Sequence, residues 1–171
     1  MKGTIVKAAE KLIISQFGIE KWEKILVKTG FDFDHVFFIR EDIEDNLVMQ
    51  MINNSCDVLE MSISQLFEAF AEYWIHFYSQ EVYPSFVFSN AKEFIANIHT
   101  IHNVMTENVP NAKPPVFEYN WKSGRELIMT YNSDRGLIDL AIPIIREIGK
   151  KYNENLSVDK IDNTHFKIIF E

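Results

Sequence analysis

Three side chains able to donate hydrogen bonds recur at two-residue spacing in residues 131–137, YNSDRGL. Tyr131, Ser133 and Arg135 alternate there with other polar residues. In a β-strand, side chains two residues apart point to the same face of the sheet. Arg binds carboxylates through paired hydrogen bonds, and hydroxyl groups add neutral ones. The row therefore suits a ligand that carries two carboxylates.

A structural role for the same residues stays open. Ser133 or Asp134 could cap a helix that begins at Gly136, which would leave Arg135 exposed. On these residues alone, helix capping is the preferred interpretation.

A second candidate is a histidine in the helix predicted over about residues 91–106. An α-helix has about 3.6 residues per turn, so its apolar residues fall in one stripe: Phe94, Ile98, Ile101 and Met105. His102 lies at the edge of this stripe and is predicted to face the interior, whereas His99 is predicted to face solvent. An imidazole directed into an apolar lobe suits a heme iron as an axial ligand. A packing role for a lone helical histidine is the alternative.

Composition limits the classes of partner. The chain has 171 residues, a net charge of −8, 47% hydrophobic residues and 14 Phe, which predicts one globular domain over residues 1–171. Nucleic acid and anionic membranes would repel an acidic surface, so neither is expected as a partner. Cys56 is the only cysteine, which excludes an internal disulfide and fits a reducing cytoplasm. No apolar run approaches the ~18 residues of a membrane span.

The remaining pattern predicts the elements that position these residues. Helices are predicted over residues 1–18, 19–30, 41–54, 62–79, 90–105 and 136–152, the last kinked at Pro143. The acidic residues 41–45 are interpreted as a first helical turn. The segment 108–115 contains three prolines and is predicted as a loop. Strands at 116–121, 125–131, 156–161 and 165–171 form two hairpins. The order predicts an α+β fold, a helical lobe with a small antiparallel sheet.

Taken together, the sequence resembles the heme-nitric-oxide/oxygen binding (H-NOX) domain family, bacterial relatives of the heme domain of soluble guanylate cyclase. The resemblance covers the whole chain, from MKGTIV through FAEYWIHFYSQE and IHNVMTENVPNAKPPVFE to YNSDRGL and the last hairpin. The Tyr-x-Ser-x-Arg row is similar to the family's clamp for the heme propionates. A histidine twelve residues before a Pro-Pro pair is the second motif, and His102 with Pro114 has that spacing.

The resemblance implies one noncovalent b-type heme between a distal helical lobe and a proximal mixed lobe. His102 would be the proximal iron ligand. Ile5 and Pro115 lie where family members press on the porphyrin and distort it. Pro115 could equally stiffen its loop.

The resemblance also implies a gas selectivity. Family members that hold oxygen carry a tyrosine five residues beyond the motif arginine, where this chain has Leu140. Ile144 adds to the apolar character of this region. Trp74 could line the distal side and Tyr78 could lie nearby, or both could be core aromatics. Without a hydrogen-bond donor, the heme is expected to bind NO and CO and to form little stable oxygen complex.

The predicted function is therefore a nitric-oxide sensor without catalytic activity. No phosphate loop, HExxH or GxSxG motif is present. The chain ends at Glu171 without an output domain, so a separate partner is expected, which the family suggests is a histidine kinase or a cyclic-di-GMP enzyme. Two alternatives stay open: a gas carrier or scavenger without an output partner, and a heme-free module that binds an apolar ligand on a similar fold.

Overall fold

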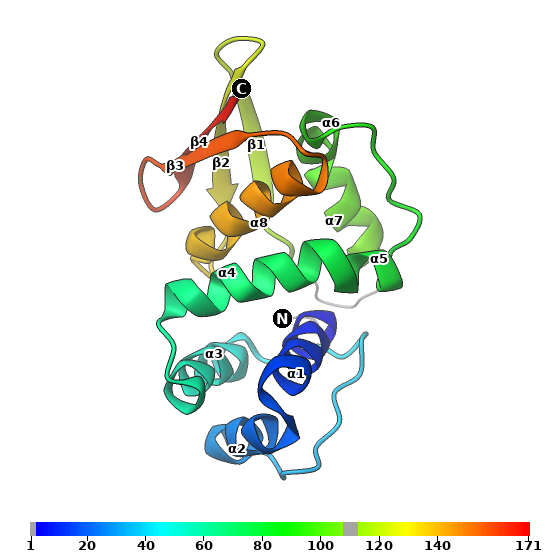
Figure 1. Cartoon of the computed structure of the whole chain (residues 1–171), viewed down its shortest axis with the longest axis vertical. Coiled ribbons are helices and arrows are strands. Elements are labelled where there is room, and N and C mark those ends of the chain that lie inside the picture. The colour runs from blue at the N-terminus through cyan, green and yellow to red at the C-terminus, as the bar shows by residue number, and fades with distance from the viewer. Residues whose placement is uncertain (1–2, 108–112) are drawn as a thin grey trace. The chain divides into compact units, whose positions relative to one another are not determined.

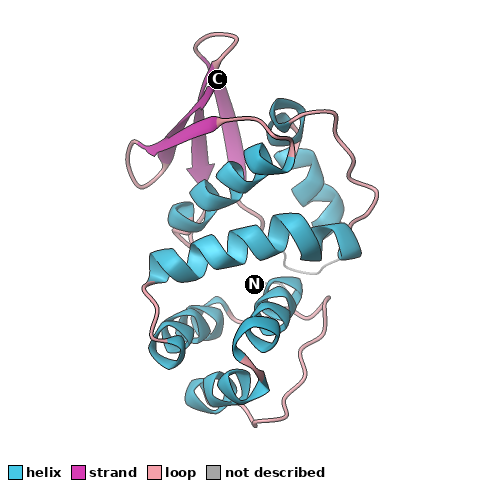
Figure 2. Ribbon diagram, in the orientation of Figure 1, coloured by secondary structure: helices cyan, strands magenta, loops and turns pink. Residues whose placement is uncertain are grey.

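The computed structural model describes residues 3–107 and 113–171, which divide into two compact units. The described helices up to Tyr73 belong to the first unit, and the second begins at Trp74 and contains the sheet (Figures 1 and 2). Helices combined with one small antiparallel sheet confirm the α+β prediction. None of the described helices combines the length and apolar character needed to cross a membrane.

The first unit is helical. Its elements are α1 (Gly3–Phe17), α2 (Ile19–Thr29), α3 (Asp45–Leu59) and α4 (Ile63–Tyr73). Ser62 and Gln65 form a capping box before α4, since each backbone N–H donates to the other residue's side chain, at 2.9 and 3.2 Å. The core of this unit includes Val6, Ile13, Trp22, Ile25, Leu26 and Phe37.

The start of α1 lies against the loop that precedes α3. The Gly3 N–H donates to the Glu41 carbonyl at 2.8 Å. A Cβ on Gly3 would lie 1.9 Å from the Phe38 carbonyl oxygen, so only glycine allows this approach. The interpretation of residues 41–45 as a helical turn is wrong, because α3 begins at Asp45. The Glu41 side chain instead accepts a hydrogen bond from the Phe38 N–H at 3.0 Å, so this acidic residue lies in the loop and bonds to its backbone.

The second unit combines short helices with the sheet. Its helical elements are the π-helix η1 (Trp74–Tyr78), α5 (Ser79–Val82), α6 (Ala91–Ala96), α7 (Ile98–Thr106) and α8 (Ile138–Lys151). The strands are β1 (Val116–Trp121), β2 (Glu126–Asn132), β3 (Leu156–Lys160) and β4 (His165–Phe170). They form one antiparallel sheet in the order β1-β2-β4-β3. Both predicted hairpins are therefore confirmed. Of the predicted loop at 108–115, residues 108–112 lie outside the described part of the chain.

The single helix predicted over about residues 91–106 is wrong in one respect, because it is broken at Asn97. This residue adopts φ −103° and ψ 5° and ends α6. Its side chain donates to the Glu93 carbonyl at 2.8 Å. Asn competes for backbone groups in this way, which disfavours continuation of a helix. The histidines 99 and 102 consequently lie in a separate helix, α7, which has its own orientation.

One apolar cluster joins α8 to the sheet. It contains residues from alternate positions of the strands and from one face of the helix: Leu127, Met129, Tyr131, Phe166, Ile168, Ile138, Ile142, Ile145 and Ile148. The period of two in the strands and of about 3.6 in the helix accounts for this pairing of faces. Pro143 lies inside α8, as predicted.

The turn between β3 and β4 is fixed by one carboxylate. Asp162 accepts from the backbone N–H groups of Thr164 and His165, at 2.7 and 2.8 Å. The hydrogen bond from the Thr164 N–H and then the one from the His165 side chain are the main causes that hold the pKa of Asp162 far below its usual value. The turn then places the Thr164 carbonyl, which accepts from the Tyr131 N–H at 2.6 Å. It therefore supports the strand end at which the Tyr131 row begins.

Gly149 is predicted to be required where α8 meets β3. A Cβ there would lie 2.7 Å from Leu156 Cγ and 2.9 Å from the Glu154 carbonyl oxygen. Gly149→Ala should lower the free energy of unfolding by about 1–2 kcal/mol net, measured by urea denaturation, because overpacking outweighs the gain in helix propensity. Gly124→Ala is the matched control, since a Cβ there meets nothing within 4 Å. Equal stability of the two variants would contradict this packing argument.

Candidate functional site

The structure orients the two histidines of α7 as the sequence predicted. His102 is half-buried, whereas His99 is exposed and bonds to Asn103 through its Nε2 at 3.1 Å. The His102 ring lies 5.8 Å from the Phe117 ring, with an angle of 35° between their planes. The imidazole therefore lies against the first strand of the sheet, next to an apolar ring.

Phe117 connects this histidine to the polar row. The register of β1 and β2 pairs Phe117 with Tyr131, and their rings lie 5.6 Å apart. His102, Phe117 and Tyr131 thus form a continuous series of ring contacts from α7 to β2. Sequence reasoning identified the two ends but missed Phe117. Its apolar side chain in a predicted strand is a signal for burial, but the sequence does not give the register that sets it opposite Tyr131.

The row YNSDRGL is only partly a strand. Tyr131 is buried, with 5% of its surface exposed, in β2, which ends at Asn132. Ser133 and Arg135 are half-buried and lie in the turn that follows. The expectation of one strand face through Arg135 is therefore wrong. The Ser133 Oγ accepts from the Arg135 N–H at 3.3 Å, which holds the two residues in one turn.

The helix-cap alternative for this row is also not what the structure contains. The helix α8 begins at Ile138 rather than at Gly136, and its N-cap Leu137 makes no side-chain cap bond. Gly136 adopts φ +62°, which glycine favours, and separates the turn from the helix. Ser133 and Arg135 thus occupy a connection between β2 and α8 without capping the helix.

The residues expected to lie near the gas ligand, Trp74, Tyr78, Leu140 and Ile144, are on η1 and α8. The rings of Trp74 and Tyr78 are 5.5 Å apart, and Tyr78 is buried with 1% exposed. Trp74 and Ile144 are both half-buried and pack against the same apolar cluster of the second unit. Leu140 is half-buried one helical turn before Ile144. Both positions on α8 carry apolar side chains.

The two residues expected to press on a porphyrin belong to different units. Ile5 is half-buried in α1 of the first unit. Pro115 is half-buried and directly precedes β1 in the second. Pro115 lies two residues before Phe117, on the same segment that contacts His102.

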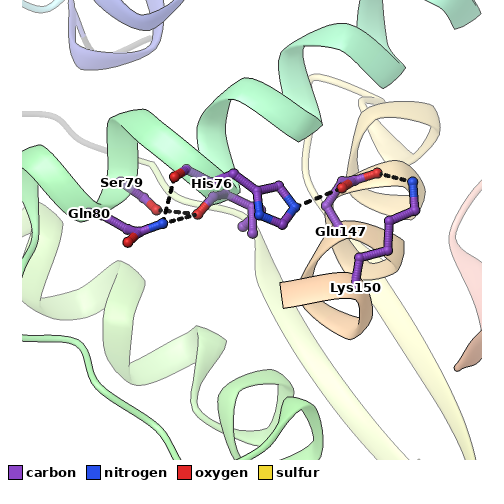
Figure 3. Close-up of polar contacts among 6 residues, drawn as sticks. His76, Ser79, Gln80, Glu147 and Lys150 are labelled. Atoms are coloured by element: carbon purple, nitrogen blue, oxygen red, sulfur yellow. Dashed lines mark hydrogen bonds and ion pairs between the residues drawn. The ribbon is translucent and has the colours of Figure 1, made fainter. Parts of the chain in front are cut away.

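One polar arrangement was missed by sequence reasoning. The Nε2 of His76, on η1, lies 2.9 Å from Oε2 of Glu147, on α8 (Figure 3). Glu147 is buried, with 3% of its side chain exposed, and its other oxygen accepts from Lys150 at 2.5 Å. The sequence separation of 71 between His76 and Glu147 explains why no local pattern indicated the contact.

These groups fit a heme. A single half-buried imidazole is sufficient as the protein ligand of a heme iron. The hydroxyl and guanidinium groups at 131–135 suit its propionates, and apolar side chains on α8 and η1 suit its ring. Burial raises the pKa of the Tyr119 phenol, on the strand that contacts α7, so this side chain is neutral at neutral pH. Among the described residues, no three His, Cys, Asp or Glu side chains gather as they would around a bare metal ion.

Solved structures share this fold over the whole chain. One is described as an oxygen-binding H-NOX domain related to soluble guanylate cyclases, in its oxygen complex (TM-score 0.86, 23% identity, 100% of this chain and 95% of that one). Another is an Fe(II) unliganded H-NOX mutant from K. algicida (TM-score 0.85, 22% identity, 100% and 97%). A third probes the function of heme distortion in the H-NOX family (TM-score 0.86, 23%, 100% and 95%).

Sequence relatives point the same way. The chain is 22% identical over 167 residues to the soluble guanylate cyclase gcy-35 of Caenorhabditis elegans, covering 94% of this chain and 24% of that protein. It is 25% identical over 145 residues to gcy-37 of the same organism, covering 81% and 20%. The chain thus spans between a fifth and a quarter of these relatives. Residues 2–160 match the model of the family described as Haem-NO-binding (HNOB). The chain therefore belongs to this family of heme-binding gas-sensor domains, which is related to soluble guanylate cyclase.

Proposed function

We propose that residues 1–171 act as one H-NOX-like domain that senses nitric oxide. Ferrous heme in such a domain supplies an iron that binds diatomic gases. The observation that carries the proposal is the series of ring contacts His102–Phe117–Tyr131, at 5.8 and 5.6 Å, which links the candidate iron ligand to the candidate propionate clamp.

Each residue then has a defined part. His102 would hold the iron through its imidazole, on a helix that contacts β1. Tyr131, Ser133 and Arg135 would bind the propionates by hydrogen bonds. Pro115, which directly precedes β1, would press on the ring together with Ile5. One structural neighbour was solved to probe heme distortion in the H-NOX family, which supports the proposed role of Ile5 and Pro115 in distorting the ring.

The selectivity for NO and CO over O₂ rests on α8. A neighbour described as an oxygen complex has the same fold at a TM-score of 0.86. The fold alone therefore does not exclude O₂ binding, so the side chains near the gas ligand must determine which gas is bound. Bound O₂ is polarised and needs a hydrogen-bond donor, whereas NO and CO need one far less. Leu140 and Ile144 have no donor side-chain atoms.

A sensor needs an output, and we propose that it is a separate protein, either a histidine kinase or a cyclic-di-GMP enzyme. The curated relatives are guanylate cyclases much longer than this chain, which supports coupling of such domains to signalling. The single cysteine supports a cytoplasmic location. Neither a catalytic residue set nor an output-free carrier role is favoured by a specific observation of the described residues.

His102→Ala, purified without added imidazole, should lack the absorption spectrum of a histidine-ligated ferrous heme, because its axial ligand is removed. His99→Ala is the matched control on the same helix, since His99 is exposed. Its spectrum should equal that of the wild-type protein. A wild-type spectrum in the His102 variant would refute the assignment of the ligand.

Arg135→Ala should lose heme faster to an apo-globin scavenger, by about tenfold or more, because a charge-assisted hydrogen bond is worth roughly 1.5–3 kcal/mol. Ser133→Ala should show a smaller increase of about fivefold. Arg125→Ala, at an exposed turn residue, serves as the control. Unchanged heme retention in both clamp variants would show that the turn 133–135 has only a structural role.

Leu140→Tyr should slow oxygen dissociation by about fivefold, because a neutral hydrogen bond contributes roughly 1 kcal/mol. Stopped-flow mixing of the oxygen complex with dithionite measures the rate. Leu140→Phe adds the ring without the hydroxyl and should retain the wild-type instability toward O₂. Equal behaviour of the two variants would mean that the missing hydroxyl does not set the selectivity.

A further inference from the structure

The segment that carries Trp74 and Tyr78 is a π-helix, η1. Such segments are rare and occur frequently at functional sites. A π-helical turn contains an extra residue, so nearby carbonyls lose their usual i+4 donors. In this chain, side chains of the next turn bond to those carbonyls. The Gln80 Nε2 donates to the His76 carbonyl at 2.6 Å and lies 3.4 Å from that of Ile75, and the Ser79 Oγ also lies 3.4 Å from the Ile75 carbonyl (Figure 3).

The side chain of His76 joins η1 to α8. It contacts the carboxylate of Glu147, whose side chain is almost completely buried at 3% exposed. The His76 side chain itself is 28% exposed. A buried carboxylate must be paired, because an unpaired charge away from water is costly. The contact at 2.9 Å is therefore a constraint on the position of η1, unlike an exposed ion pair. Lys150 bonds to the same carboxylate but lies 67% exposed on α8 itself.

The geometry places this contact between the two groups of candidate pocket residues. On η1, His76 lies midway between Trp74 and Tyr78, so its position limits the rotation of the segment that carries both rings. On α8, Glu147 lies one turn after Ile144 and two turns after Leu140. Trp74 and Ile144 also pack against one apolar cluster. The contact therefore couples the placement of the aromatic pair to the apolar face of α8.

We propose that His76 and Glu147 are positioning residues of the gas pocket: their contact fixes the rotation of the π-helix and thereby sets where Trp74 lies relative to Leu140 and Ile144. The proposal rests on the proposed function, in which these residues line the site of the gas ligand. It assigns a role to a contact with a buried carboxylate, made by two residues outside the row Tyr131, Ser133 and Arg135.

The test replaces both partners by apolar groups of similar size, His76→Leu with Glu147→Met. Replacement of both leaves no buried unpaired group, so the fold is retained while the directional contact is lost. The single variant His76→Leu is made alongside. Arg146→Met is the matched control, because Arg146 precedes Glu147 on α8 but bonds to the Val158 carbonyl of β3 at 3.0 Å. Lys150→Met removes the hydrogen bond between the exposed Lys150 and the Glu147 carboxylate and leaves the contact with His76 in place.

Two measurements are made on the full chain. The first is the ¹⁹F NMR spectrum with 5-fluorotryptophan, recorded without heme and as the CO complex. Trp74 is assigned through Trp74→Phe, and Trp22 of the first unit serves as an internal reference. The second is the CO dissociation rate of the ferrous heme-loaded protein.

The double variant should shift the Trp74 resonance in both forms, leave Trp22 in place, and change the CO dissociation rate by about fivefold, as expected for loss of one hydrogen bond. Arg146→Met and Lys150→Met should leave the resonance and the rate near their wild-type values. A Trp74 resonance at the wild-type position in the double variant, or an equal shift in Arg146→Met, would overturn the proposal. If the wild-type chain held no heme, the proposed function would fail, whereas the heme-free spectrum would still test the contact.

Discussion

The pairing of β1 with β2 is the constraint on which the candidate site depends. Its register sets Phe117 opposite Tyr131, and α7 places the His102 ring 5.8 Å from the Phe117 ring. A shift of one residue in this register would turn Phe117 to the other face of the sheet. The contact between candidate iron ligand and candidate clamp would then be lost, although every motif residue would still be present in the sequence.

Two further connections, which involve β3 and the turn between β3 and β4, support this arrangement. The Asp162 turn places the Thr164 carbonyl, which accepts from the Tyr131 N–H. The close approach at Gly149 brings α8 against β3. Because α8 also carries Leu140 and Ile144, the packing that stabilises the second unit also places the apolar face proposed to select the gas. The proposed selectivity therefore depends on the same helix as the packing of the second unit.

Elements with strong local signals were predictable from the sequence. The α+β class, both hairpins and the helix around Pro143 follow from periodicity and turn residues. The inward orientation of His102 followed from helical geometry and is confirmed even though Asn97 breaks the helix before it. That break was not predictable by periodicity, since apolar spacing continues across Asn97 while its side chain bonds to the backbone.

The features that were not predicted are of two kinds. Some are contacts between residues distant in the sequence, and others are backbone conformations set by side-chain hydrogen bonds. The contact between His76 and Glu147 depends on how η1 packs against α8, and the π-helix has no simple sequence pattern. Ser133 and Arg135 were expected to share one strand face with Tyr131 because the three residues alternate with others. The Ser133 side chain instead bonds to the Arg135 N–H and, with Gly136, turns the chain toward α8.

The proposed function requires that this chain holds a ferrous heme through a histidine and binds NO and CO in preference to O₂. Absorption spectra of the reduced protein, recorded alone, with NO, with CO and in air, measure both properties. We expect a histidine-ligated ferrous spectrum, distinct changes with NO and CO, and no lasting oxygen complex in air. Absence of a heme spectrum, or a stable oxygen complex in the wild-type protein, would contradict it.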